Sequence, residues 1–313
     1  EMSWKGNTIR GTISGDGALG LTPEGELQTL SADWSAENIF MDAPNLFDGG
    51  FSLEALKFKG VFDAPTKSLQ IEQVLARKGP FELQLAGSLT DNPVSMGVKL
   101  AGTVKDLSIP DLKRLWPAGT VPGARDWIFA NIHEGSIRKA DINVDLLPGA
   151  IVDDRIPDEM LAVDFQLAGL KVTYLSGLPD LMSVNGTAIL NGDTFRGELK
   201  SGQIGAISLK KGGILINELH KTGAVGNVSG TFTGPTRDIL TLIDAPRLRY
   251  PSRYGIQADK AGGTSNVDFA FAIPMLRDLN ASDIGIDVNA ELLDVKLPIN
   301  DKFGLTGGKF SVK

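Results

Sequence analysis

The chain has 313 residues, of which 42% are hydrophobic and 22% charged, so its composition is that of a folded protein with a core. Acidic residues outnumber basic ones by 38 to 31, and the net charge of −7 argues against a nucleic-acid-binding surface, which is normally basic. The lack of cysteine excludes a disulfide framework, a thiolate zinc site and thiol catalysis. The sequence contains neither the ~18–20 apolar residues of a membrane span nor a signal peptide. Because both ends read as interrupted strands, we expect a piece of a longer chain.

Alternating apolar and polar residues predict strands along most of the chain. The clearest examples are residues 81–85, 94–100, 142–146, 163–167, 267–273 and 284–292. A period of two places every second side chain on the same face of a sheet. One face is then apolar, and the other carries Asp, Asn, Gln, Lys and Glu. This pattern is typical of an antiparallel sheet that is wetted on one side only.

Helical patterns are short and few. They cover residues 110–116, 122–132 and 235–244, and each begins with proline in or near its first turn. Pro117, Gly135 and Pro246 follow these segments and are typical helix stops. We interpret the helices as connectors on a mainly β framework.

Two segments of the chain resemble each other. In residues 102–110 and 290–298, an aspartate (Asp106 or Asp294) interrupts an alternating strand and a proline closes it. The similarity favours a repeating β unit, as in elongated repeat architectures.

A glycine-rich motif near the start, residues 15–20, matches the pattern of a dinucleotide-binding turn. That function needs a helix directly after the turn, so that the helix N-terminus holds the pyrophosphate. Thr22 and Pro23 followed by Gly25 do not sustain a helix. The motif therefore predicts a plain hairpin turn.

Residues suited to metal or acid–base chemistry are sparse. Asp141, Asn143 and Asp145 have the spacing of a calcium loop, but Leu146 stands where that loop needs glycine. We therefore favour the interpretation that these three side chains lie on the solvent-exposed face of a strand. His133 and His220 are the only histidines, and neither has a second ligand at metal spacing. We predict no metal, no cofactor and no enzymatic activity, while a carbohydrate-active enzyme with dispersed carboxylates stays an open alternative.

The apolar face itself allows two interpretations. Either it packs against a second sheet as the closed core of a sandwich, or part of it lines an open groove for a hydrophobic ligand. Alternation alone does not choose between them.

A block of tryptophan, proline and arginine carries a resemblance to a known family. It comprises Leu112, Leu115, Trp116 and Pro117, then Ala124, Arg125, Trp127 and Ile128, then Asn131, Ile132, Gly135 and Ala140. This block resembles the signature of the YhdP-type proteins of the AsmA-like group. Residues 174–179, 184–188 and 230–235 also resemble that family. The resemblance covers roughly residues 78–300, so we divide the chain into a β segment at 1–77 and a family-like region at 78–313.

The resemblance implies a Gram-negative envelope protein that is anchored in the inner membrane and extends through the periplasm. It implies an elongated, twisted antiparallel sheet curled into a hydrophobic trough, with a few short helices near 110–133 and 235–244. The expected function is to shield phospholipid or other acyl-chain lipid between the inner and outer membranes, which are reached through regions outside this sequence. The alternative is a structural envelope scaffold with a closed sandwich core. The family offers no catalytic residues.

The groove candidates follow from strand parity alone. They are Leu83, Leu85, Val98, Leu100, Ile142, Val144, Phe165, Leu167, Phe269, Phe271, Ile284, Ile286 and Val288.

Overall fold

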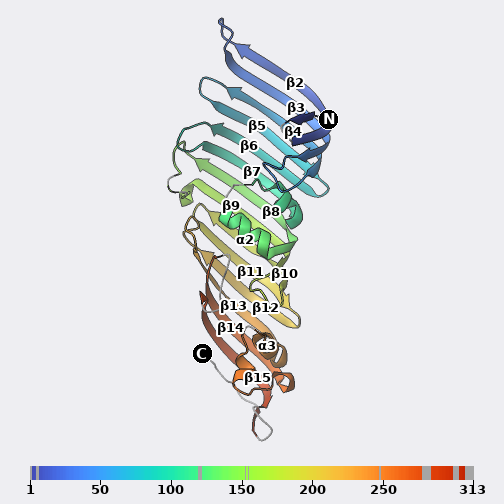
Figure 1. The fold of residues 1–313 in the computed structure, drawn as a ribbon, viewed down its shortest axis with the longest axis vertical. Helices are drawn as coiled ribbons and strands as arrows, with labels where there is room; N and C mark the ends of the chain where they lie inside the picture. Colours follow the sequence, from blue (N-terminus) through green and yellow to red (C-terminus); the bar gives the residue numbers. More distant parts are fainter. Residues whose placement is uncertain are drawn as a thin grey trace. The chain divides into compact units, whose positions relative to one another are not determined.

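A computed structural model describes residues 2–4, 7–118, 122–151, 153, 155–246, 248–276, 283–298 and 303–306. Within these residues the chain is mainly β, and the strands form one sheet of 16 strands whose order follows the chain from β1 to β16 (Figure 1). The described pairings are antiparallel, as predicted. The first and last strands of the order do not pair with each other, so the sheet is open.

The first eight strands are β1 (Met2–Trp4), β2 (Asn7–Leu21), β3 (Leu27–Asp42), β4 (Phe51–Asp63), β5 (Ser68–Lys78), β6 (Phe81–Thr90), β7 (Gly97–Ser108) and β8 (Ile132–Leu146). The second eight are β9 (Leu161–Val172), β10 (Leu181–Asn191), β11 (Thr194–Ile204), β12 (Ile207–Ile216), β13 (Val225–Pro235), β14 (Gly262–Pro274), β15 (Gly285–Pro298) and β16 (Gly304–Thr306). Every strand predicted from alternation is present, and most run longer than predicted.

The helices are short, and the predicted ones lie where the sequence placed them. They are α1 (Ile109–Leu115), α2 (Pro122–Asn131), α3 (Thr236–Ile243) and α4 (Tyr250–Arg253), with the 3₁₀ turns η1 (Asp158–Met160) and η2 (Ala258–Lys260). Ser108 caps α1, because its hydroxyl accepts a hydrogen bond from the backbone N–H of Asp111 at 3.1 Å. Among the described residues, none of these helices is long and apolar enough to cross a membrane.

Close packing divides the chain into two units. Unit 1 comprises Glu1–Asp126, Ser136–Gln166 and Ile189–Thr194, and unit 2 comprises Trp127–Gly135, Leu167–Ala188 and Phe195–Lys313. This division describes packing, and the separation after residue 77 stays a prediction.

Four strands contain a non-glycine residue in the left-handed conformation. These residues are Asn38 (φ 51°), Asp106 (φ 47°), Ser183 (φ 53°) and Asp294 (φ 50°). Such a residue shifts the alternation by one, so that buried residues on either side of it stand three apart: Ala36 and Ile39 around Asn38, and Val104 and Leu107 around Asp106. Asp106 and Asp294, which the sequence comparison aligned, adopt the same backbone conformation.

We expect the backbone at Asp106 to control which substitutions are tolerated there. The side chain is exposed, so Asp106→Gly is expected to leave stability nearly unchanged, because glycine adopts positive φ without strain. Asp106→Val is expected to lower the free energy of unfolding by about 1–2 kcal/mol, because a β-branched residue is strained in that region. Urea denaturation measures both variants. Equal stability of the two variants would show that backbone strain is not the constraint.

The predicted hairpin turn at residues 15–20 is wrong. These residues lie inside β2, and the turn comes at residues 22–26, where the N–H of Thr22 donates to the carbonyl of Glu26 at 2.8 Å. A Cβ atom at Gly15 would lie 2.3 Å from the carbonyl oxygen of Asp33 on β3. Gly15 therefore serves the close approach of two strands, and not a turn.

Candidate functional site

In unit 2, the strand register brings apolar residues from four strands onto one face of the sheet, which we call the unit 2 apolar face. Cross-strand partners point to the same side of an antiparallel sheet. One row runs from β12 to β15 through Ile214, Val228, Phe271 and Ile286, and the next runs through Gly212, Gly230, Phe269 and Val288. The candidates Phe269, Phe271, Ile286 and Val288 thus lie together. Ile284 lies on the chain just before β15.

Aromatic rings line this face. The ring centroids of Phe232 and Phe269 are 4.9 Å apart, and those of Phe269 and Phe271 are 5.0 Å apart, both pairs stacked. Phe269 and Phe271 are only half-buried, and Ile286 is 47% exposed. The middle of the face is therefore not covered by described residues of the chain.

One end of the unit 2 apolar face is closed. Helix α3 packs on β13 and β14 there, and its first residue, Thr236, shares a 2.8 Å hydrogen bond with Ser265 of β14. Both hydroxyl residues are 1% exposed. Leu240, Ile256 and Leu292 pack around Ala261 beside them. Among the residues that the structure describes, the same face is thus a sealed core at this end and is left uncovered in its middle.

In unit 1, six of the candidates share one face that spans β6, β7 and β8, the unit 1 apolar face. Gly102 of β7 pairs with Leu85 of β6 on one side and with Ile142 of β8 on the other. Leu100 of β7 pairs with Val144 of β8. Leu83 and Val98 lie on the same side, and all six candidates are half-buried. The absence of a side chain at Gly102 leaves room for Leu85, since a Cβ there would lie 2.5 Å from Cδ2 of Leu85.

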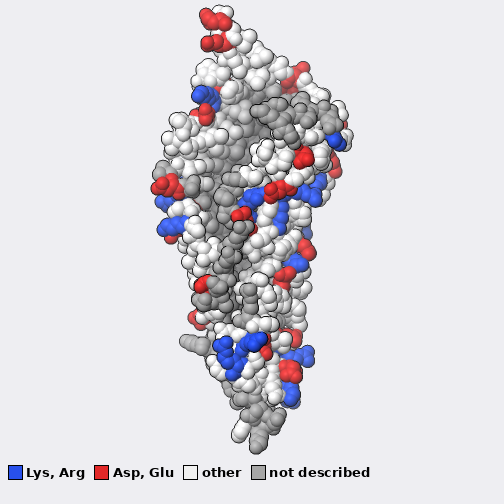
Figure 2. Space-filling view, viewed as in Figure 1, with Lys and Arg blue, Asp and Glu red and all other residues white. Residues whose placement is uncertain are grey.

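The unit 1 apolar face extends beyond these candidates toward β2. One cross-strand row runs through Gly15, Trp34, Phe58, Val74, Leu85, Gly102 and Ile142. Apolar side chains at its outer strands, Ile13, Leu19 and Leu30, are exposed. In Figure 2 the charged side chains of unit 1 lie mainly at the margins and near α2. Sequence parity missed these outer residues because glycines interrupt the alternation in β2.

The remaining two candidates, Phe165 and Leu167, lie on β9 and are half-buried. The boundary between the units crosses this strand, so Phe165 belongs to unit 1 and Leu167 to unit 2.

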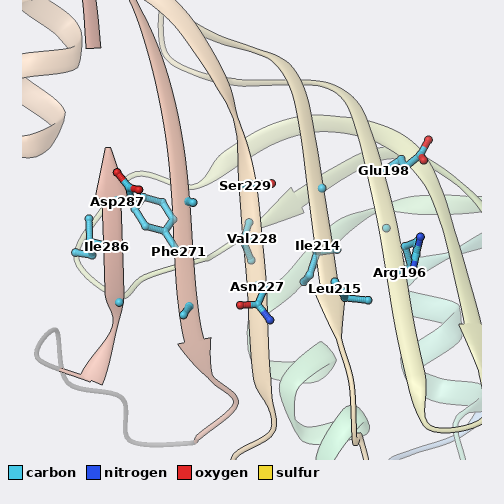
Figure 3. A pocket seen from close by; sticks show the side chains of 15 residues that line it. Arg196, Glu198, Ile214, Leu215, Asn227, Val228, Ser229, Phe271, Ile286 and Asp287 are labelled. Carbon is cyan, nitrogen blue, oxygen red and sulfur yellow. The ribbon is translucent and has the colours of Figure 1, made fainter. Parts of the chain in front are cut away.

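A shallow hollow of about 660 Å³ in unit 2 was not predicted (Figure 3). Five strands each contribute three consecutive residues to it, centred on Gly197, Ile214, Val228, Phe271 and Ile286. Because side chains alternate, the two flanking residues on each strand lie on the face opposite the Phe271 side chain. These include Arg196, Glu198, Asn227, Ser229 and Asp287. The hollow is therefore lined largely from the face opposite Phe271, where these polar side chains stand beside Gly213, Leu215, Ala270, Ala272 and Gly285.

Asp141, Asn143 and Asp145, which have the spacing of a calcium loop, lie on strand β8, as the strand interpretation predicted. Nζ of Lys139 lies 2.6 Å from Oδ2 of Asp141, and Nζ of Lys99 lies 3.7 Å from Oδ2 of Asp145. These carboxylates belong to cation–carboxylate pairs along a solvated strand face.

A polar cluster in unit 2 surrounds Asp180. The hydroxyl of Thr173 donates to Oδ1 of Asp180 at 2.6 Å, Nζ of Lys171 lies 3.5 Å from Oδ2, and Nε2 of His133 lies 2.9 Å from the Thr173 hydroxyl. Burial, and then the charge of Asp180, raise the pKa of nearby Tyr174 to about 12. Tyr174 therefore stays protonated at neutral pH, and the contacts connect β8 with the chain after β9.

A lysine and an aspartate form an ion pair at the start of α1. Nζ of Lys78 lies 2.6 Å from Oδ1 of Asp111, and the Ser108 hydroxyl donates to Oδ2 at 2.7 Å. Burial raises the pKa of Asp111, but the hydrogen bonds from Lys78 and Ser108 outweigh it and hold the pKa below its usual value. Arg125 forms an ion pair with Asp48.

Comparison with known proteins gives one family. A family model described as YhdP protein matches residues 23–310 of the chain. No curated protein and no solved structure shows a significant match. The match includes most of the first 77 residues, where the sequence resemblance was only general.

Proposed function

The chain belongs to the YhdP family, and we propose that it holds phospholipid acyl chains on its apolar sheet faces during transport between the inner and outer membranes. In this proposal the chain is a periplasmic part of an inner-membrane-anchored AsmA-like protein of a Gram-negative bacterium. It catalyses no reaction, and its direct partners are lipid molecules.

The observation that carries the proposal is the apolar surface that the described residues leave uncovered, in the middle of the unit 2 apolar face and at the outer strands of the unit 1 apolar face. Contiguous apolar surfaces of this kind mark binding sites in soluble proteins. Exposure of an acyl chain to water costs about 0.8 kcal/mol per CH₂, so a lipid and an uncovered apolar face stabilise each other. Ile214, Val228, Phe271 and Ile286 offer a continuous row without a charged side chain.

The lipids bound by the purified chain test this proposal. The chain is produced in the periplasm of a Gram-negative host, purified without detergent, and extracted with organic solvent for mass spectrometry. We expect phospholipid in a constant ratio to protein, and none with a host periplasmic protein carried through the same steps. A chain that is folded and lipid-free, and that takes up no lipid from vesicles, would favour the scaffold alternative.

A further inference from the structure

Four exposed side chains form a group around helix α4, which we call the Arg–Tyr patch: Arg249, Tyr250, Arg253 and Tyr254. Tyr250 is 43% exposed and Tyr254 is 70% exposed. The guanidinium carbon of Arg253 lies 6.0 Å from the centre of the Tyr250 ring. In Figure 2, Lys and Arg side chains gather beside the position of α3 on the viewed face. The patch is cationic although the chain as a whole carries a net charge of −7.

The two arginines of the patch have spare binding capacity. Within the described residues neither guanidinium forms an ion pair, whereas Lys78 and Arg125 near α1 and α2 are paired with carboxylates. The charge of Arg249 acts on Asp244, whose carboxylate also accepts a hydrogen bond from the backbone N–H of Ser252 at 2.9 Å. An exposed guanidinium with free donors is suited to a bidentate contact with phosphate.

The fold holds the patch in place. Pro251 is buried between its two halves, and its carbonyl accepts hydrogen bonds from the N–H groups of Tyr254 at 3.1 Å and Ile256 at 2.9 Å. Ile256 in turn packs into the cluster around Ala261. The exposed side chains therefore project from a backbone that is anchored in the closed end of the unit 2 apolar face.

The position of the patch suits a molecule with a charged head and apolar tails. Leu292 packs in the cluster that anchors the patch, and it lies on the same side of β15 as Val288. These two positions are about 13 Å apart at the rise of a strand, close to the ~15 Å of hydrocarbon in one leaflet of a bilayer. The middle of the face is thus within the length of an acyl chain of the cluster that anchors the patch.

We propose that the Arg–Tyr patch binds the phosphate of an anionic phospholipid whose acyl chains lie on the unit 2 apolar face. The proposal rests on the function proposed above and names the headgroup that this end of the face selects. The arginines contact the phosphate, and the tyrosines lie at the boundary between head and tails, where amphipathic rings are favoured.

Uptake from vesicles tests the headgroup assignment. Phosphatidylcholine vesicles carry a trace of radiolabelled phosphatidylglycerol or of radiolabelled dioleoylglycerol, which has the same tails without a phosphate. At low salt, the double variant Arg249→Gln with Arg253→Gln is expected to have about 25-fold lower apparent affinity for phosphatidylglycerol. This figure assumes that each positive charge near a lipid surface contributes roughly a fivefold gain in affinity. Affinity for dioleoylglycerol is expected to stay unchanged. Lys67→Gln with Lys99→Gln removes two exposed charges of unit 1 as the matched control.

The outcomes separate this proposal from the proposed function. Unchanged phosphatidylglycerol uptake in the arginine variant, or an equal loss of dioleoylglycerol uptake, overturns the headgroup assignment while lipid binding by the wild type stands. Full competition by free glycerol phosphate assigns the patch to a soluble phosphate instead and also overturns it. A wild-type chain that takes up neither lipid removes the proposed function itself.

Discussion

Replacing Phe271 by aspartate is expected to abolish lipid retention while the chain stays folded. Phe271 is only half-buried, in the middle of the unit 2 apolar face, so an aspartate there is expected to reach water when no lipid is bound. When lipid is bound, the same carboxylate is surrounded by hydrocarbon, and burial of an unpaired charge is strongly unfavourable. Loss of the ring stacked on Phe269 at 5.0 Å costs only about 0.5–1.5 kcal/mol beyond the area it covers.

Two further substitutions make this experiment decisive. The first is Ile286→Asp. Ile286 is the cross-strand neighbour of Phe271, and because its side chain is 47% exposed, it contributes less to folding. Ala270→Asp adds the same charge to the same strand on its opposite, exposed face and is expected to keep the lipid. Lipid per folded chain is measured by mass spectrometry, and folding by circular dichroism.

Each alternative gives a different result. If both apolar-face variants unfold, the face is a closed core, and the result supports the scaffold function instead of lipid binding. If they fold and keep lipid, while Ala270→Asp loses it, the lipid lies in the hollow on the opposite face of the sheet.

Much of the fold follows from local patterns in the sequence. Strands such as β6 and β14 alternate without interruption, and the three predicted helices carry proline near their starts and clear stops, so short-range physics specifies them. The register shows that parity also grouped residues correctly: Leu85, Leu100 and Val144 lie on one face of unit 1. Contact of these residues with lipid stays a prediction.

The errors and omissions have non-local causes. The glycines of residues 15–20 predict a turn locally, but the neighbouring strand β3 requires them for close approach. Asn38 and Ser183 shift the alternation of their strands through a left-handed backbone, which residue hydropathy does not reveal. The closed end of the unit 2 apolar face depends on a hydrogen bond between Thr236 and Ser265, which are 29 residues apart. No periodicity within α3 or β14 predicts that contact.

Replacing Leu209 by alanine is expected to destabilise unit 2 strongly without weakening its affinity for lipid. Leu209 is 3% exposed and pairs across β12 and β13 with Phe232, in the row that continues to Val267 and Ala290. Truncation of a buried leucine costs about 2–5 kcal/mol, because apolar contact is lost and a cavity remains. Urea denaturation followed by circular dichroism measures the loss.

The matched control for Leu209 is Leu215→Ala on the same strand, where the side chain is half-buried on the opposite face and a smaller loss is expected. Lipid affinity of the folded fraction separates the two roles of the apolar face. We expect the Leu209 variant to lose much stability and keep its lipid affinity, and the Phe271 variant to fold normally and lose its lipid affinity. Together these results would mean that the row through Leu209 acts as core and the row through Phe271 as ligand surface. A loss of both properties at either position would mean that the face acts as one unit, and the division between its sealed end and its uncovered middle would be wrong.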